Sequence, residues 1–305
     1  MIPAAIGPSQ ILAALAVFVL GCAVGSFLNV LIWRFPRGLS VSVPRRSFCP
    51  HCERPIRSSD NIPILSYLLL RGKCRHCGAP ISGRYPLVEA LTGVLLAALY
   101  VVQRVGAGTD PGEVIVMGAM TALLIAASAV DMEWFIIPDE FSVFGIAGGL
   151  LAGLLLPGLH VGAQPYHTLQ SLTGLRHLDG LIGSGIGALG GGALVLVFAV
   201  LGTLVFRKEA IGFGDVKLMA MVGAFLGWKV AFLGFFLAPF FGLLYGIPLL
   251  ILRDEHVMPF GPFLSSGAVL VALMRTGACG WLVRYLRIAA ELLGMLLGIG
   301  GGPAL

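Results

Sequence analysis

The sequence predicts an all-α polytopic membrane protein, with about seven to nine transmembrane helices and a small cytoplasmic loop domain that resembles a zinc ribbon. Three observations support this fold class. Hydrophobic residues make up 57% of the chain and charged residues only 11%, which is far more apolar than a soluble domain. The basic residues gather in one segment, and the same segment holds two Cys-x-x-Cys pairs.

Apolar runs recur along the whole chain. A run of about 20 such residues spans the hydrocarbon core, and it must be helical because lipid offers backbone groups no hydrogen bonds. The run 216–252 has room for two passes, whereas the later runs are short and rich in glycine, so the number of crossings after Lys229 stays open. The runs lie at 9–33, 86–103, 113–130, 141–157, 181–206, 216–252, 257–274 and 278–299.

The charge distribution predicts which side each loop faces. From Arg34 to Arg84 there are ten Lys or Arg residues and two acids, whereas the rest of the chain holds ten bases and thirteen acids. By the positive-inside rule, this basic segment is cytoplasmic. No basic residue precedes the first run, so we expect an uncleaved anchor with its N-terminus outside. Attraction to anionic lipid explains the basic segment more simply than nucleic-acid binding, and we expect no nucleic-acid partner.

The basic segment also contains four cysteines with metal-ligand spacing. Cytoplasmic thiols are normally reduced, which argues against disulfides. Two Cys-x-x-Cys pairs 21 residues apart match a four-cysteine zinc ribbon, whose closed tetrahedral site is structural. Redox dithiols are the alternative, but no βαβ pattern surrounds either pair. The expected ligands belong to the motifs CPHC and CRHC: Cys49, Cys52, Cys74 and Cys77.

Two acids stand where apolar runs meet a loop. Asp131 directly follows the run 113–130, and Asp215 lies in the motif GFGD between glycines and another apolar run. Two spans lead from the cytoplasmic loop to Asp131, and two more lead to Asp215. An even number of crossings predicts both acids at the cytoplasmic face. Asp139 follows Pro138 and is expected to cap the next helix instead.

A pair of carboxylates at a poorly solvated membrane edge predicts acid–base chemistry. Two close carboxylates cannot both ionise easily, so one retains a proton and the pair can act as general acid and general base on a water molecule. This is the chemistry of aspartyl proteases. The alternatives are caps or ion-pair members without catalysis, an ion-coupled membrane transporter, and a zinc-ribbon membrane scaffold.

Four motifs carry a resemblance to a known family. In order they are GSFLNVLIWRFP at 25–36, the cysteine-bearing segment at 47–93, DMEWFIIPD at 131–139 and GFGDVKLM at 212–219. With these motifs the chain resembles the prepilin peptidases, also called type IV leader peptidases, which belong to the GxGD intramembrane aspartyl proteases.

The resemblance implies two activities. The first is cleavage of a basic leader, after a glycine, from type IV prepilins or type II secretion pseudopilins, with Asp131 and Asp215 as the catalytic pair. The second is methylation of the new N-terminal amine by S-adenosylmethionine, which the family assigns to the cytoplasmic loop and to a glycine that matches Gly72.

The resemblance also implies a domain order and a location. Residues 1–33 would form the first transmembrane helix, 34–85 the zinc-binding and presumed methyltransferase domain, and 86–305 the transmembrane aspartyl protease domain. The protein would be a multi-pass protein of the bacterial inner membrane, with the acids and the zinc loop at the cytoplasmic face.

Overall fold

The computed structural model describes residues 7–43, 46–207, 211–253 and 258–275, together with residues 277, 279, 280 and 284. Over these residues the regular structure is helical, with only isolated β-bridges in the loops. The predicted all-α fold is therefore confirmed. The expected apolar run 278–299 lies almost wholly outside the described residues.

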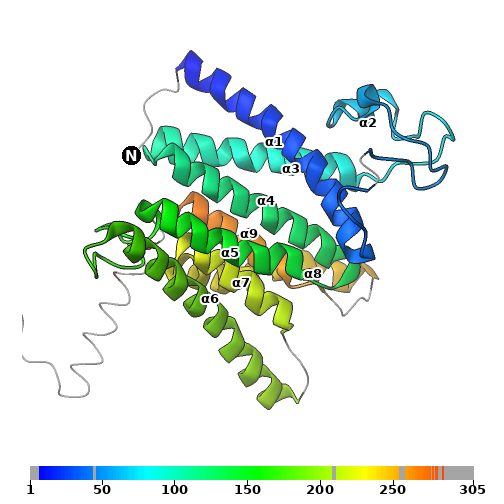
Figure 1. Cartoon of the computed structure of the whole chain (residues 1–305). Coiled ribbons are helices and arrows are strands. Elements are labelled where there is room, and N and C mark those ends of the chain that lie inside the picture. The colour runs from blue at the N-terminus through cyan, green and yellow to red at the C-terminus, as the bar shows by residue number, and fades with distance from the viewer. Residues whose placement is uncertain are drawn as a thin grey trace, which may run out of the picture.

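Nine α-helices are described, and eight of them form a bundle (Figure 1). The short helix α2 lies in the loop between α1 and α3, which projects from one end of the bundle. The helices are α1 (Pro8–Arg34), α2 (Leu65–Leu69), α3 (Arg84–Leu99), α4 (Pro111–Trp134), α5 (Asp139–Leu155), α6 (Arg176–Phe206), α7 (Phe213–Leu226), α8 (Trp228–Arg253) and α9 (Gly261–Leu273).

Five of the described helical segments are long and apolar enough to cross a membrane on their own. The helices α5, α7 and α9 are shorter, with 17, 14 and 13 residues. The expected number of seven to nine crossings is reached only if these short helices also cross, within the bundle. The five segments are Pro8–Arg37, Arg84–Gly106, Pro111–Trp134, Arg176–Val205 and Trp228–Pro248.

The long run 216–252 forms two helices, as its length predicted. The break falls at Gly227, whose φ of +85° favours glycine because a Cβ is strained at positive φ. This turn between α7 and α8 lies against the 157–175 connection. There the ring of His160 is 3.0 Å from the carbonyl oxygen of Ala224 and 3.0 Å from Thr168 Oγ1.

Helix α7 is held in the middle of the bundle by very close contact with α6. A Cβ added to Gly187 would lie 2.0 Å from the carbonyl oxygen of Gly223, and a Cβ added to Gly223 would lie 2.0 Å from that of Gly187. Small residues at such a contact let two backbones approach, which is how membrane helices gain packing energy. The position of α7 therefore depends on this glycine pair, and α7 carries Asp215.

Candidate active site

The structure brings Asp131 and Asp215 to the same end of the bundle. Asp131 is in the last turn of α4 and Asp215 is in the first turn of α7. Only 6% and 8% of their surfaces are exposed, and the two carboxyl groups are close enough to interact electrostatically. The two acids thus share one end of the bundle, as an even number of crossings between them predicts, and they have little access to water.

The glycines of the GFGD motif explain how Asp215 reaches this position. Gly212 is the N-cap of α7, and its carbonyl accepts a hydrogen bond from the Asp215 amide at 3.1 Å. A carboxylate in the first turn of a helix is favoured by the helix dipole. A Cβ on Gly214 would lie 3.1 Å from Cβ of Ile137. Glycine therefore lets α7 start directly against the segment that follows α4.

Asp131 is held from a third helix. The amide of Gly261, at the start of α9, donates a hydrogen bond to Asp131 Oδ2 at 2.9 Å. A Cβ on Gly261 would lie 2.7 Å from the same oxygen, so only glycine leaves the carboxylate where it is. Sequence reasoning missed Gly261. The available signal was the Pro-Phe-Gly-Pro stretch at 259–262, which interrupts the apolar sequence between the run that ends near 252 and the run that follows.

Two other acids near this end form ion pairs. Asp139 pairs with Lys217. Pro138 is the N-cap of α5, so the prediction that Asp139 caps this helix was wrong: Asp139 is the first residue of the helix and its side chain turns to the lysine. Glu133 pairs with Arg84 at the start of α3. Asp131 and Asp215 form no such pair with the described cations, which distinguishes them chemically.

The four loop cysteines converge on one point. All four sulfur atoms lie within 4.8 Å of one another, and Cys49 Sγ is 3.9 Å from Cys77 Sγ. Four thiolates at about 2.3 Å from a tetrahedral Zn²⁺ are about 3.8 Å apart, so the donor set fits this ion. The structure therefore brings together the predicted metal ligands in a group that could hold a metal.

Each Cys-x-x-Cys pair sits in the same kind of turn. In the first, the Glu53 amide donates to the Cys49 carbonyl, and in the second the Gly78 amide donates to the Cys74 carbonyl. Both donors have positive φ. Amide groups of Cys77 and His76 near the Cys74 sulfur lower the pKa of this thiol to about 7. At Cys74 this turn favours the thiolate, which is the form that binds metal.

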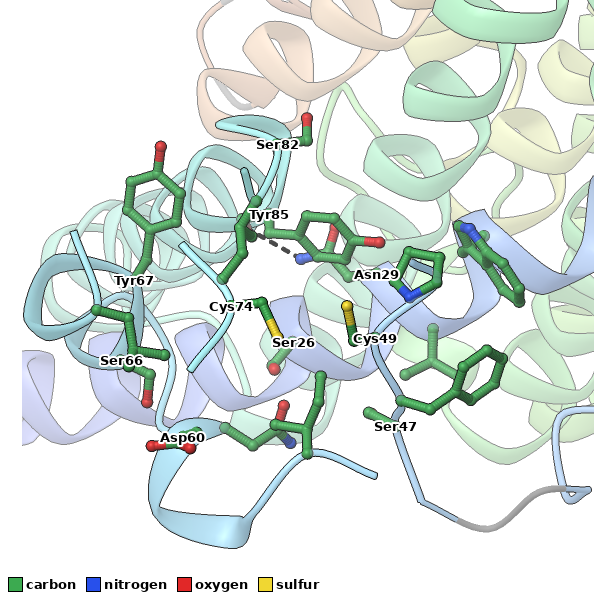
Figure 2. A pocket seen from close by; sticks show the side chains of 18 of the residues that line it. Ser26, Asn29, Ser47, Cys49, Asp60, Ser66, Tyr67, Cys74, Ser82 and Tyr85 are labelled. Carbon is green, nitrogen blue, oxygen red and sulfur yellow. Dashed lines mark hydrogen bonds between the residues drawn. The ribbon is translucent and has the colours of Figure 1, made fainter. Parts of the chain in front are cut away.

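A cavity of about 400 Å³ lies beside the cysteine cluster (Figure 2). Its walls come from the loop, from α1 and the start of α3, and from Glu133 after Asp131 on α4. Cys49 and Cys74, both labelled in Figure 2, line this cavity, and their sulfur atoms lie within 4.8 Å of each other. The volume falls in the range of small-molecule sites.

Gly72 does not line this cavity. It has a φ of +66°, and a Cβ there would lie 3.1 Å from Tyr67 Oη. Its amide also donates to the Tyr67 carbonyl at 2.9 Å. Tyr67 does line the cavity, so Gly72 lies behind the cavity wall, against this tyrosine.

Comparisons with known proteins agree with this geometry. A family model described as the bacterial peptidase A24 N-terminal domain matches residues 19–103, and one described as the type IV leader peptidase family matches residues 118–247. No solved structure gives a significant match.

Curated relatives match most of the chain. A prepilin leader peptidase/N-methyltransferase of Aeromonas hydrophila is 34% identical over 87% of this chain and 92% of its own length. A type 4 prepilin-like proteins leader peptide-processing enzyme of Escherichia coli is 36% identical over 82% and 89%. A prepilin leader peptidase/N-methyltransferase of Myxococcus xanthus is 39% identical over 82% and 66%. The chain therefore belongs to the type IV leader peptidase family.

Proposed function

We propose that this chain is a bifunctional membrane enzyme, which cleaves the leader from prepilin-like substrates and then methylates the new N-terminal amine. The observation that carries the peptidase activity is the meeting of two buried carboxylates, Asp131 and Asp215, at one end of an apolar helix bundle. The names of the relatives support both activities. An ion-coupled transporter has no comparable support.

In the proposed mechanism the two acids share one proton and activate a water molecule between them. The ionised member removes a proton from the water, and the oxygen forms a bond to the scissile carbonyl carbon. The protonated member supports the developing charge on the carbonyl oxygen. When the C–N bond breaks, the leaving nitrogen takes up a proton and becomes the new N-terminus. The Gly261 amide, which donates to Asp131, keeps this carboxylate in place.

The substrates would be type IV prepilins or type II secretion pseudopilins, which have a basic leader before an apolar helix. The apolar helix would pack against the spans while the leader stays at the cytoplasmic interface. The basic segment between Arg34 and Arg84 supports this orientation by the positive-inside rule. The protein would then lie in the bacterial inner membrane with its acids facing inward.

The loop domain of residues 34–85 would carry the second activity, and residues 86–305 the peptidase. Zn²⁺ held by the four cysteines would order the loop, since a segment of this size buries too little apolar surface to be stable alone. S-adenosylmethionine would supply a methyl group to the neutral amine. Gly72 would contribute by keeping Tyr67 in position.

The test is cleavage of a prepilin by purified wild type, Asp131→Asn and Asp215→Asn in detergent or vesicles. Asn preserves the shape of the side chain and removes its acid–base chemistry, so both variants should lose cleavage by at least a thousandfold, as expected when an essential acid–base group is removed. Mass spectrometry of the product N-terminus should show a methyl group only when S-adenosylmethionine is added.

Asp139→Asn is the matched control because Asp139 is a carboxylate at the same end, exposed and paired with Lys217. It should cut at nearly the wild-type rate. Normal cleavage by either Asp131→Asn or Asp215→Asn would contradict the assignment of the acid pair.

A further inference from the structure

We propose that the cavity between the loop and helices α1 and α3 is the methyl-donor site, and that it binds the amino-acid end of S-adenosylmethionine through Asn29, Arg84 and Glu89. This inference rests on the proposed methyltransferase activity. It assigns that activity a place and a set of residues. Neither the cysteine motifs nor Gly72 identifies these residues.

The first argument is that buried polar atoms on the cavity wall lack hydrogen-bond partners. Asn29 is only 3% exposed, and its Nδ2 donates to the Tyr85 carbonyl at 3.0 Å (Figure 2). Its Oδ1 is buried without a hydrogen-bond partner, and so is Nε of Arg84. A buried polar group without a partner costs about 1–3 kcal/mol. The acceptor Asn29 Oδ1 and the donor Arg84 Nε lie on the same cavity wall. Their free hydrogen-bonding capacity indicates that a bound ligand forms hydrogen bonds with both.

The second argument is the buried carboxylate of Glu89. This side chain is 7% exposed, lines the cavity and accepts a hydrogen bond from the Ile64 amide at 2.7 Å. The amide contact fixes the loop against α3, but it brings no positive charge. No described cation forms an ion pair with Glu89. A buried carboxylate without a counter-charge favours a cationic ligand.

These three groups lie close together by their positions in the helices. Asn29 on α1 donates a hydrogen bond to the carbonyl of Tyr85, the residue after Arg84. Glu89 lies one helical turn after Tyr85 on α3. They therefore form one wall that offers a donor, an acceptor and a negative charge. A zwitterionic α-amino acid has the complementary set: its carboxylate would accept from Arg84, and its ammonium group would donate to Asn29 and face Glu89.

The rest of the cavity suits the remaining parts of the donor. The rings of Tyr67 and Tyr85 line it and offer faces for a purine base and for a sulfonium cation, which aromatic rings attract. Gly72 holds Tyr67 in place, as described above, so a larger residue at 72 would narrow this part of the cavity.

The cavity also lies within reach of the peptidase acids. Glu133 lines it, and Asp131 is two residues earlier on α4. Positions two residues apart point to nearly opposite sides of a helix, so the cavity and the acid pair lie on different sides of the same end of α4, and a helix is about 10–12 Å in diameter. A new N-terminus released at Asp131 would have only this short path to the donor.

The direct test is equilibrium binding of tritiated S-adenosylmethionine to the purified full-length protein in detergent, without any prepilin. We expect Asn29→Leu and Glu89→Gln each to weaken binding by about tenfold to a hundredfold, the usual effect of losing a hydrogen bond to a charged group. Ultraviolet cross-linking of the bound donor should label peptides that contain residues 26–37 or 82–89.

Thr92→Val is the matched control. Thr92 is fully buried on α3 one turn after Glu89, does not line the cavity, and bonds only within its own helix. Its variant should bind the donor as the wild type does. Zinc content and a single symmetrical elution peak would show that each variant is folded. Glu89→Gln preserves the side-chain shape if Asn29→Leu does not fold.

The outcomes separate the site from the function. If the wild type methylates cleaved prepilin while Asn29→Leu and Glu89→Gln bind the donor as tightly as the wild type, the site is wrong and the function stands. Labelling of other peptides has the same meaning. If the wild type binds the donor at these residues but never methylates, the site stands and the methyltransferase function fails. No binding by the wild type would contradict the site.

Discussion

Single residues in this chain show why an apolar protein retains a few buried polar groups. Asp131 sits among apolar side chains at the end of α4, yet one of its oxygens accepts a hydrogen bond from a backbone amide 130 residues away. A carboxylate in such a place is costly, and ionisable residues inside membrane proteins are functional candidates by default. The contact with Gly261 sets where this carboxylate points.

Gly261→Ala is therefore expected to impair cleavage without unfolding the protein. The new Cβ would lie 2.7 Å from Asp131 Oδ2, so the carboxylate has to move from the position that the proposed mechanism requires. A displacement of about 1 Å at a reacting group lowers kcat by about a hundredfold. The measurement is kcat for prepilin cleavage, together with the melting temperature.

Gly185→Ala is the control, because a Cβ at Gly185 meets nothing within 4 Å and alanine is the better helix former. It should leave kcat unchanged. An unimpaired Gly261→Ala enzyme would show that the contact does not position the acid.

At this scale the sequence predicted some residues and could not predict others. Asp131 and Asp215 stand out because acids are rare beside apolar runs, and the four cysteines because of their spacing. Asn29 carries no such signal, and the signal for Gly261 is only the Pro-Phe-Gly-Pro break at 259–262, which does not show what the glycine contacts. Their importance comes from partners on other helices, Tyr85 and Asp131, and a contact 56 or 130 residues away along the chain has no local pattern.

At the scale of the elements, the loop between α1 and α3 depends on its cysteines. The two turns that carry them repeat the same hydrogen bonds 25 residues apart: Glu53 to Cys49 and Gly78 to Cys74. The remaining loop contacts include a bidentate Arg75–Asp60 ion pair, in which the arginine side chain is about half exposed. An ion pair that is open to solvent on one side contributes only modestly to stability. The metal would thus be the main contribution to the order of this loop.

Cys74→Ser should remove bound zinc and loosen the loop while the bundle stays folded. We expect about one zinc per chain in the wild type and almost none in the variant by elemental analysis, because one missing thiolate breaks the tetrahedral set. Limited proteolysis should then cut within residues 46–82. Cys22→Ser is the control, since Cys22 lies on α1 outside the cysteine cluster, and zinc retained in full by Cys74→Ser would contradict the site.

The contact between α6 and α7 gives a second prediction at this scale. Gly187→Ala adds a Cβ that would lie 2.0 Å from the carbonyl oxygen of Gly223, so α7 must shift. Overpacking of this kind costs about 1–3 kcal/mol, although alanine favours the helix. Both the melting temperature and the cleavage rate should fall, because α7 carries Asp215.

Gly185→Ala, on the same helix without a neighbour, again serves as the control. An equal response of the two variants would mean that helix propensity decides the effect and that the close contact does not.

The helix boundaries show which features a hydropathy pattern can predict and which it cannot. It predicted that 216–252 holds two helices, and the structure places the break at Gly227. It did not predict that α7 would have only 14 residues, about 21 Å of helix and less than the hydrocarbon thickness. A helix this short is stable in a bundle because neighbouring helices surround it, which is a tertiary effect.

At the scale of the whole molecule, the two ends of the bundle differ in chemistry. Buried polar contacts stabilise the end opposite the acids. Lys229 donates hydrogen bonds to the carbonyls of Pro165 and His167, and Arg275 forms an ion pair with Glu113. His160 belongs to the same end and is completely buried. Its burial lowers its pKa to about 4.

This histidine predicts a loss of stability in acid. Folded protein keeps His160 neutral down to about pH 4, whereas the unfolded chain binds a proton below about pH 6.5. The unfolded state therefore binds more protons in this window, so stability is full above pH 6.5 and falls as the pH drops towards 4, by at most about 3 kcal/mol. Melting temperatures in detergent between pH 4.5 and 7 measure this.

His160→Gln should flatten that dependence, although it also lowers the stability at neutral pH by removing the contacts with Thr168 and Ala224. His177→Gln is the control because His177 is exposed, and it should retain the acid sensitivity. A wild-type slope that persists in His160→Gln would assign the effect to other groups.

The last prediction concerns which end of the molecule faces which side of the membrane. Between Ser42 in the loop and Gly174 in the connection after α5, the chain passes through α3, α4 and α5, so an odd number of crossings separates them. Both positions are exposed, and an epitope inserted at either should leave the bundle intact. In spheroplasts, whose inner membrane is intact, antibody should bind the Gly174 epitope at once and the Ser42 epitope only after the inner membrane is permeabilised.

If both epitopes are reached from the same side, one of the three helices does not cross. The 17-residue α5 is the first candidate, and Asp131 and Asp215 could then meet only if α6 also failed to cross.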